Sequence, residues 1–91
     1  MSRRGRVDII ADILVAAGEG DTKTGIMYRS NMNFARFERY FGELVDVGLI
    51  EVVNGIVGER RAIYKASKKA CRWLVDLKLV EDSIRNRAYK G

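Results

Sequence analysis

The sequence predicts a small, mainly helical domain with one β-hairpin, and three observations lead to this fold class. Hydrophobic residues recur with helical spacing in four segments, near residues 6–17, 22–30, 34–47 and 67–89. Between the third and fourth segments, residues 49–53 are rich in β-branched side chains, and Asn54-Gly55, a common hairpin turn, follows at once. The length of 91 residues suits one domain with a modest core.

The first helix is expected over residues 6–17. Asp8 and Asp12 lie in its early turns, where the helix dipole favours negative charge. The segment Gly18-Glu19-Gly20 is expected to end it. Its apolar residues share one face, namely Ile9, Ile10, Ile13, Leu14 and Ala17. We therefore expect this helix to support the two helices that follow.

The next two helices are expected to be joined by a tight polar turn, Ser30-Asn31-Met32-Asn33. Asp21 or Thr22 can cap the shorter helix, and Asn33 can cap the longer one. Gly48 suits the left-handed position that ends a helix. The longer helix has one apolar face, formed by Phe34, Phe37, Phe41, Leu44 and Val45. A short helix, a short turn and a second helix are typical of the helix-turn-helix motif.

The opposite face of the longer helix is predicted to carry Arg36, Arg39, Tyr40 and Glu43. In a helix-turn-helix the second helix lies in the major groove of DNA. Arginine can donate two parallel hydrogen bonds to guanine or to phosphate. The alternative is a solvated face on which Arg39 and Glu43 form an i,i+4 pair. Contacts to the DNA backbone are expected from residues around the turn, namely Lys23, Arg29, Ser30, Asn31 and Asn33.

A hairpin directly after a helix-turn-helix forms the wing of a winged helix. Residues 49–53 and 60–65 are its expected strands, and either Asn54-Gly55 or Gly58 can make the turn, so the register stays open. Arg60 and Arg61 are expected near the tip of this wing. They either contact phosphates and the minor groove or only keep the hairpin soluble.

The last helix is expected from Ser67, its cap, to about Tyr89. One apolar stripe contains Ala70, Trp73, Leu74, Leu77, Ile84 and Ala88, and a roughly opposite one contains Cys71, Val75 and Leu79. A small domain covers one side of such a helix, so the remaining apolar stripe is expected to pack against the same helix of a second subunit. The predicted dimer interface contains Cys71, Trp73, Leu74, Val75, Leu77, Leu79 and Ile84. The alternative is that both stripes pack within one chain. Cys71 is expected to be a buried small hydrophobe.

The net charge of +5 indicates a polyanionic partner. Basic residues concentrate in residues 51–91 and at the start of the chain, where residues 1–5 are expected to form a flexible arm that either lies on DNA or only aids solubility. The chain has no histidine and one cysteine, so neither imidazole catalysis nor a thiolate metal cage is expected. We therefore expect no enzyme activity, cofactor or metal. No apolar run reaches the length of a membrane span, and a cytoplasmic, nucleoid-associated location is expected.

Residues 23–34 read Lys-Thr-Gly-Ile-Met-Tyr-Arg-Ser-Asn-Met-Asn-Phe and resemble the K-T-x-I-M-Y-x-x-N-L-[S/N]-[Y/F] signature of small archaeal winged-helix DNA-binding proteins. That group includes ten-kilodalton crenarchaeal chromatin-type proteins. The resemblance implies a winged helix-turn-helix, an antiparallel dimer through the C-terminal helix, and binding to duplex DNA. The chain departs from the group at Met32, which replaces a leucine, and at Lys69-Ala70, where a Lys-Gly pair is frequent. Its wing is longer and its last helix is shorter.

The sequence thus predicts a mainly α fold with a β-hairpin wing. A flexible basic arm is expected at residues 1–5, a winged helix-turn-helix DNA-binding domain at 6–66, and a dimerisation helix at 67–91. The predicted function is a homodimer that binds double-stranded DNA as a transcription regulator or a nucleoid-type protein. The alternative is a winged-helix adaptor that binds another protein and does not bind DNA directly.

Overall fold

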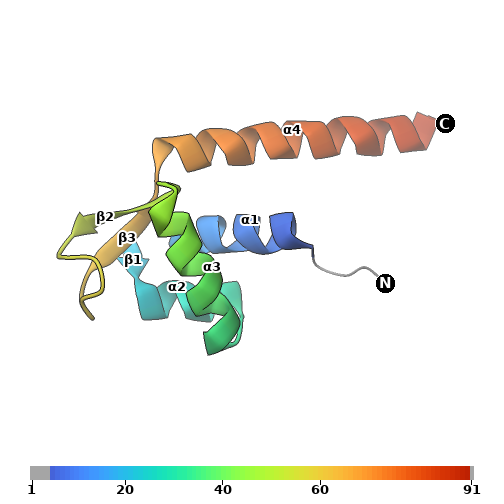
Figure 1. The fold of residues 1–91 in the computed structure, drawn as a ribbon. Helices are drawn as coiled ribbons and strands as arrows, with labels where there is room; N and C mark the ends of the chain where they lie inside the picture. Colours follow the sequence, from blue (N-terminus) through green and yellow to red (C-terminus); the bar gives the residue numbers. More distant parts are fainter. Residues whose placement is uncertain (1–4, 91) are drawn as a thin grey trace.

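In the computed structural model, residues 5–90 are described, apart from the side chains of residues 81 and 85–90. The elements follow the order α1 (Arg6–Ala17), β1 (Asp21–Thr22), α2 (Lys23–Ser30), α3 (Phe34–Asp46), β2 (Ile50–Asn54), β3 (Ile63–Ala66) and α4 (Lys68–Lys90). The first three helices form a body with the hairpin at one end, and α4 runs over this body and past it (Figure 1). Residues 1–4 of the expected arm lie outside the described residues, as does the side chain of Ala88.

The hydrophobic core lies between α1, α2, α3 and the sheet. Phe37 stacks on Phe41 with ring centroids 5.2 Å apart, and Phe41 meets Tyr64 edge-on at 4.9 Å. This aromatic cluster joins α3 to β3. On α1, the predicted apolar face is confirmed, because Ile9, Ile13, Leu14 and Ala17 are all buried.

Helix α3 begins and ends as the sequence predicted. The Asn33 side chain accepts a hydrogen bond from the Arg36 backbone N–H at 2.9 Å. At the other end, the Leu49 N–H donates to the Leu44 carbonyl at 2.9 Å and the Gly48 N–H donates to the Val45 carbonyl at 3.1 Å. Gly48 has a φ of 80°, so this is a Schellman motif closed by a left-handed glycine.

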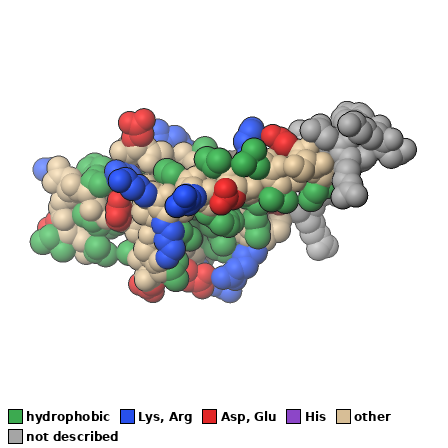
Figure 2. All heavy atoms as spheres, turned by 90° about the horizontal axis from the view of Figure 1, so that it is seen from above, with side chains coloured by type: hydrophobic (Ala, Val, Ile, Leu, Met, Phe, Trp, Pro, Cys, Tyr) green, Lys and Arg blue, Asp and Glu red, His purple; other side chains and the backbone are tan. Residues whose placement is uncertain are grey.

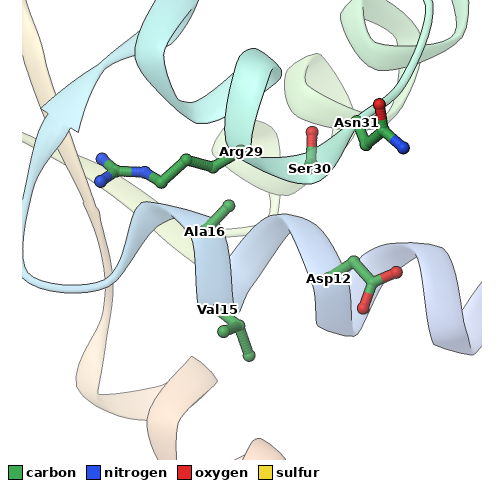
Figure 3. Close-up of a pocket in the computed structure, with 6 residues that line it drawn as sticks. All are labelled: Asp12, Val15, Ala16, Arg29, Ser30 and Asn31. Atoms are coloured by element: carbon green, nitrogen blue, oxygen red, sulfur yellow. The ribbon is translucent and has the colours of Figure 1, made fainter.

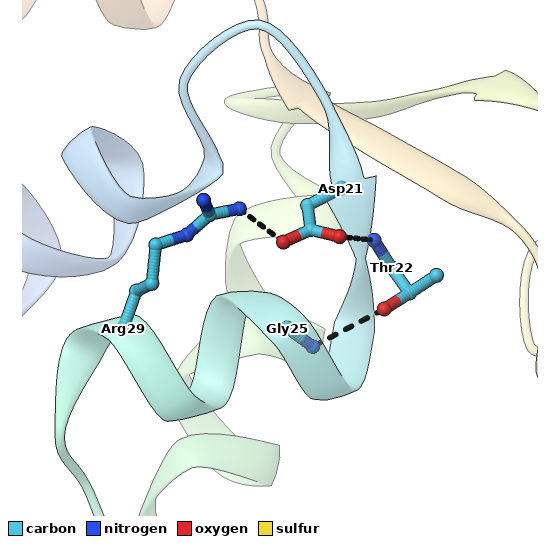
Figure 4. A network of polar contacts seen from close by, with 4 residues as sticks. All are labelled: Asp21, Thr22, Gly25 and Arg29. Atoms are coloured by element: carbon cyan, nitrogen blue, oxygen red, sulfur yellow. Dashed lines mark hydrogen bonds and ion pairs between the residues drawn. The ribbon is translucent and has the colours of Figure 1, made fainter.

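Helix α2 is capped by Thr22, whose hydroxyl accepts from the Gly25 N–H at 3.2 Å. The Asp21 carboxylate accepts from the Thr22 N–H at 2.7 Å and pairs with the Arg29 guanidinium (Figure 4). Gly25 lies against this carboxylate, and a Cβ at Gly25 would lie 2.6 Å from Cγ of Asp21. A larger residue at position 25 would therefore displace Asp21.

The sheet is antiparallel with the order β1-β3-β2, and β1 was not predicted. Asp21 pairs with Tyr64, and Thr22 pairs with Ile63. The return strand was predicted over 60–65 but begins at Ile63, and Asn54-Gly55 does not form a two-residue turn. A longer loop, residues 55–62, is tied instead to the core residue Tyr64, whose hydroxyl accepts from the Gly58 N–H at 3.0 Å.

Helix α4 is capped by Ser67, whose hydroxyl accepts from the Ala70 N–H at 3.3 Å. Ala70 is buried, and Trp73 and Leu74 are half-buried against the core. Cys71 was expected to be buried but is exposed, because it lies about 100° around the helix from Ala70 and so points away from the body. None of the described helices combines the length and the hydropathy needed to cross a membrane.

Candidate nucleic-acid interface

The outer face of α3 carries Arg36 and Arg39, which are exposed and lie three residues apart. Among the side chains that the structure describes, neither guanidinium group has a hydrogen-bond or ion-pair partner. The Arg39–Glu43 pair, which the sequence left as an alternative, does not form. Glu43 instead accepts a hydrogen bond from Nη2 of Arg6 at 3.2 Å. Both arginines are therefore available to a partner outside the chain.

Tyr40 is half-buried beside this face, and the Arg6 guanidinium lies 5.6 Å from the centroid of its ring. Together with the Arg6–Glu43 pair, this contact fixes the start of α1 to the middle of α3. The Tyr40 ring therefore has a structural role, and only part of its surface is accessible.

Phe34 was expected on the buried face of α3, but 64% of its surface is exposed. It is the first residue of the helix, and Met32 in the preceding turn packs against the core in that region. Helical spacing alone does not show where the core ends, so the sequence could not separate Phe34 from Phe37, which is fully buried. An exposed phenylalanine therefore stands at the start of α3, two residues before Arg36 and on a different side of the helix.

Two residues of the turn between α2 and α3 form hydrogen bonds within the chain. Asn31 is left-handed, with a φ of 55°, and its N–H donates to the Met27 carbonyl at 3.1 Å. Ser30 was expected at the DNA backbone, but it is buried and its hydroxyl donates to the same carbonyl at 2.9 Å. The side chain of Ser30 is therefore not on the surface, whereas Asn31 and Asn33 are exposed.

Two further basic residues of the predicted site have partners within the chain. Nζ of Lys23 lies 2.7 Å from a carboxylate oxygen of Glu38 and 5.4 Å from the ring centroid of Phe41. Arg29 pairs with Asp21 at the start of α2 (Figure 4). Both cations hold α2 in place, so their use by a polyanion would compete with an intramolecular ion pair.

The tip of the wing carries two more cations without a described partner. Arg60 and Arg61 are exposed in the loop of residues 55–62, and no partner is present for either guanidinium among the described side chains. Ile56 and Val57 are also exposed there, at 68% and 59%. These two residues were not predicted as part of the site, although the sequence shows an apolar pair between Gly55 and Gly58.

An open hollow of about 520 Å³ lies between α1 and α2, away from the outer face of α3. Figure 3 shows side chains from both helices around it. They are Asp12, Val15, Ala16, Arg29, Ser30 and Asn31. Among the side chains that the structure describes, no cluster of His, Cys, Asp or Glu is suited to holding a metal ion.

Solved structures with a similar fold include Sso10a-2, a DNA-binding protein from Sulfolobus solfataricus. The TM-score is 0.70 at 21% identity, over 96% of this chain and 92% of that one. An apo-form variant of ZitR from Lactococcus lactis gives 0.65 at 14% identity, over 93% of this chain and 64% of that one. A MarR family transcriptional regulator from Silicibacter pomeroyi gives 0.61 at 15% identity, over 89% and 53%. No curated protein sequence gives a significant match.

The sequence pattern of one protein family covers nearly the whole chain. The family is described as winged helix-turn-helix, and the match extends over residues 3–84. The helix order, the three-stranded antiparallel sheet and the hairpin after α3 agree with this description. The chain therefore belongs to the winged helix-turn-helix family.

Proposed function

We propose that this protein is a homodimer that binds double-stranded DNA, as a transcription regulator or a nucleoid-type protein. The observation that carries the proposal is a division among the basic side chains. Arg6, Lys23 and Arg29 are paired within the chain. Arg36, Arg39, Arg60 and Arg61 have no partner among the described side chains, and they stand on two surfaces that a winged helix can present together to DNA, the outer face of α3 and the wing tip. Further exposed basic residues lie on α4, namely Lys68, Lys69, Arg72 and Lys78.

In this proposal, α3 enters the major groove. Arg36 and Arg39 are three residues apart, which corresponds to about 4.5 Å along the helix axis. They can therefore reach neighbouring base edges or phosphates. Phe34 and the exposed Ala35 stand at the N-terminal end, the part of a recognition helix that contacts base edges.

The other contacts are assigned to the DNA backbone and its edges. Asn31 and Asn33 hold the turn against phosphates, and Arg60 and Arg61 hold the wing. Lys23 and Arg29 contribute by fixing α2, and Ser30 contributes through its backbone hydrogen bond. Because neutralised phosphates release counterions, binding through these groups must weaken steeply as salt rises.

Dimerisation is assigned to α4. Two apolar side chains of its far half are exposed, Val80 at 55% and Ile84 at 63%. The helix has 23 residues, or about 35 Å at about 1.5 Å per residue. Half-sites in helix-turn-helix dimers lie about 34–36 Å apart, so a pair of such helices has a suitable length to separate two copies of α3.

The test is fluorescence anisotropy on duplex DNA at several salt concentrations, with the wild type and an Arg36→Ala/Arg39→Ala variant. Loss of two phosphate contacts should reduce the slope of log affinity against log salt by about 1.8, and affinity at low salt should fall about tenfold or more. The single variants Arg36→Ala and Lys78→Ala each remove one exposed charge, from α3 and α4 respectively. Only Arg36→Ala should lower the affinity for DNA strongly.

A preference of about a thousandfold for one duplex over a random one would identify a site-specific regulator, and equal binding would favour the nucleoid-type role. Failure of the wild type to bind any duplex at low salt would contradict the proposal and favour the adaptor function. An unchanged slope for the double variant would remove α3 from the interface.

A further inference from the structure

The wing carries hydrophobic side chains that the core does not use. Ile56 and Val57 are 68% and 59% exposed, and Val53 at the end of β2 is 48% exposed. Figure 2 shows hydrophobic side chains gathered at the left-hand end of the molecule, where Figure 1 places the hairpin. Single exposed apolar residues are common, but neighbouring ones such as Ile56 and Val57 can mark an interaction site.

The loop that carries them is held together by its own hydrogen bonds. The Ile56 N–H donates to the Glu59 carboxylate at 2.9 Å, and the Glu59 N–H donates back to the Ile56 carbonyl at 2.9 Å. The Ala62 N–H donates to the Glu59 carbonyl at 3.2 Å, and Gly58 is tied to the buried Tyr64 at 3.0 Å. The apolar pair is therefore presented on a loop that is anchored to the core.

The charges around the pair fit a polyanion. Arg60 and Arg61 follow it in the loop, and both are exposed and unpaired among the described side chains. Glu59 is the acidic residue of the loop, and its exposed carboxylate accepts a hydrogen bond from the Ile56 N–H. The tip thus combines an apolar pair with two outward cations, and this combination matches a nucleic acid better than an apolar protein surface.

We propose that Ile56 and Val57 act as a wedge that enters the minor groove and bends the duplex, while Arg60 and Arg61 hold the flanking phosphates. This inference rests on the proposed DNA-binding function and adds an architectural activity to it. Apolar side chains inserted between base steps partly unstack them and kink DNA by about 20–90°. Flexible pyrimidine–purine steps such as TA should be preferred, because they are the easiest to unstack.

The experiment measures bending and binding on the same complex. A duplex with a central TA step carries a donor and an acceptor dye at its two ends, and energy transfer is recorded at saturating protein. The wild type should increase energy transfer above that of free DNA. Ile56→Ser/Val57→Ser should still bind, with about three- to tenfold lower affinity, but should leave energy transfer near the free value. Its salt slope should be unchanged, because both wing arginines remain.

Val15→Ser is the matched control, because Val15 is 67% exposed on α1 and outside the wing. It should bind and bend as the wild type does, and thermal melting should show that both variants are folded. Bending by the double variant at the wild-type level, or binding by the wild type without bending, would overturn the wedge and leave the proposed function standing. A wild type that binds no duplex would overturn both.

Discussion

Helices α3 and α4 are both amphipathic, but only α3 finds cover for its main apolar face within the chain. Phe37, Phe41 and Leu44 are buried, and the outer face of α3 presents arginines. Helix α4 buries Ala70 near its start, yet Ile84, further along the same stripe, is 63% exposed. The comparison shows that α3 buries one side in the core and leaves a basic side exposed, whereas the far half of α4 has an apolar surface that the fold does not use.

The largest expected effect comes from disrupting the dimer interface that we propose for α4. Ile84→Glu places a charge on the exposed stripe, and it should split the dimer without unfolding the domain, because Ile84 touches little of its own chain. Light scattering should then report a species near the chain mass of 10.3 kDa. DNA affinity should fall by about 10²–10⁴, because two linked recognition helices become one.

Ser83→Glu is the control for this change. It adds the same charge one residue earlier, at an exposed position about 100° around the helix from Ile84. This variant should remain a dimer. A wild type that scatters as a monomer at micromolar concentration would contradict the interpretation of α4 directly, and would make α4 a helix whose apolar face serves some other partner.

The difference between the two helices also shows what could be predicted from sequence. The ends of α3 were predictable because caps are local signals, as Asn33 and Gly48 confirm. The exposure of Phe34 was not, since periodicity describes a helix face but not the distance over which the core follows it. The exposure of Cys71 was missed for another reason, because its burial was expected from the residue type and not from its place on the helix.

Non-local contacts explain the other differences. Strand β1 has two residues and exists only through its pairing with β3. Asn54-Gly55 was predicted to form a two-residue turn, but the hairpin is closed by a wider loop that is anchored on Tyr64. This anchor is a non-local contact, so local turn preferences do not predict it. In the candidate site, the exposure of Arg36 and Arg39 followed from helical spacing. The pairing of Lys23 with Glu38, fifteen residues away in sequence, did not.

A smaller effect should test the proposed role of the N-terminal end of α3. We expect Phe34 to contact thymine methyl groups, because an exposed phenylalanine at the start of a recognition helix can meet them in the major groove. A duplex in which uracil replaces thymine lacks those methyl groups and keeps its pairing. Wild-type affinity should fall about three- to tenfold on the uracil duplex, as measured by anisotropy.

Phe34→Ser should bind the two duplexes equally, and its affinity for the thymine duplex should match that of the wild type for uracil. Tyr28→Ser is the control, because Tyr28 is 75% exposed on α2 and outside the proposed groove contacts. It should still distinguish thymine from uracil. Equal binding of both duplexes by the wild type would exclude the methyl contact while leaving the arginine contacts untouched.

The smallest effect concerns two helical glycines. A Cβ at Gly42, on the outer face of α3, would meet nothing within 4 Å, so Gly42→Ala should stabilise the fold by about 1 kcal/mol. The melting temperature should rise by about 4–8 °C at fixed protein concentration. Gly25→Ala is the matched control on α2, where the new Cβ would displace the Asp21 carboxylate and weaken its pair with Arg29. It should lower the melting temperature. If Gly42→Ala also lowered the melting temperature, the outer face of α3 would already be occupied, for example by a second copy of the chain. That face would then contribute to stability and would not be free to bind a partner.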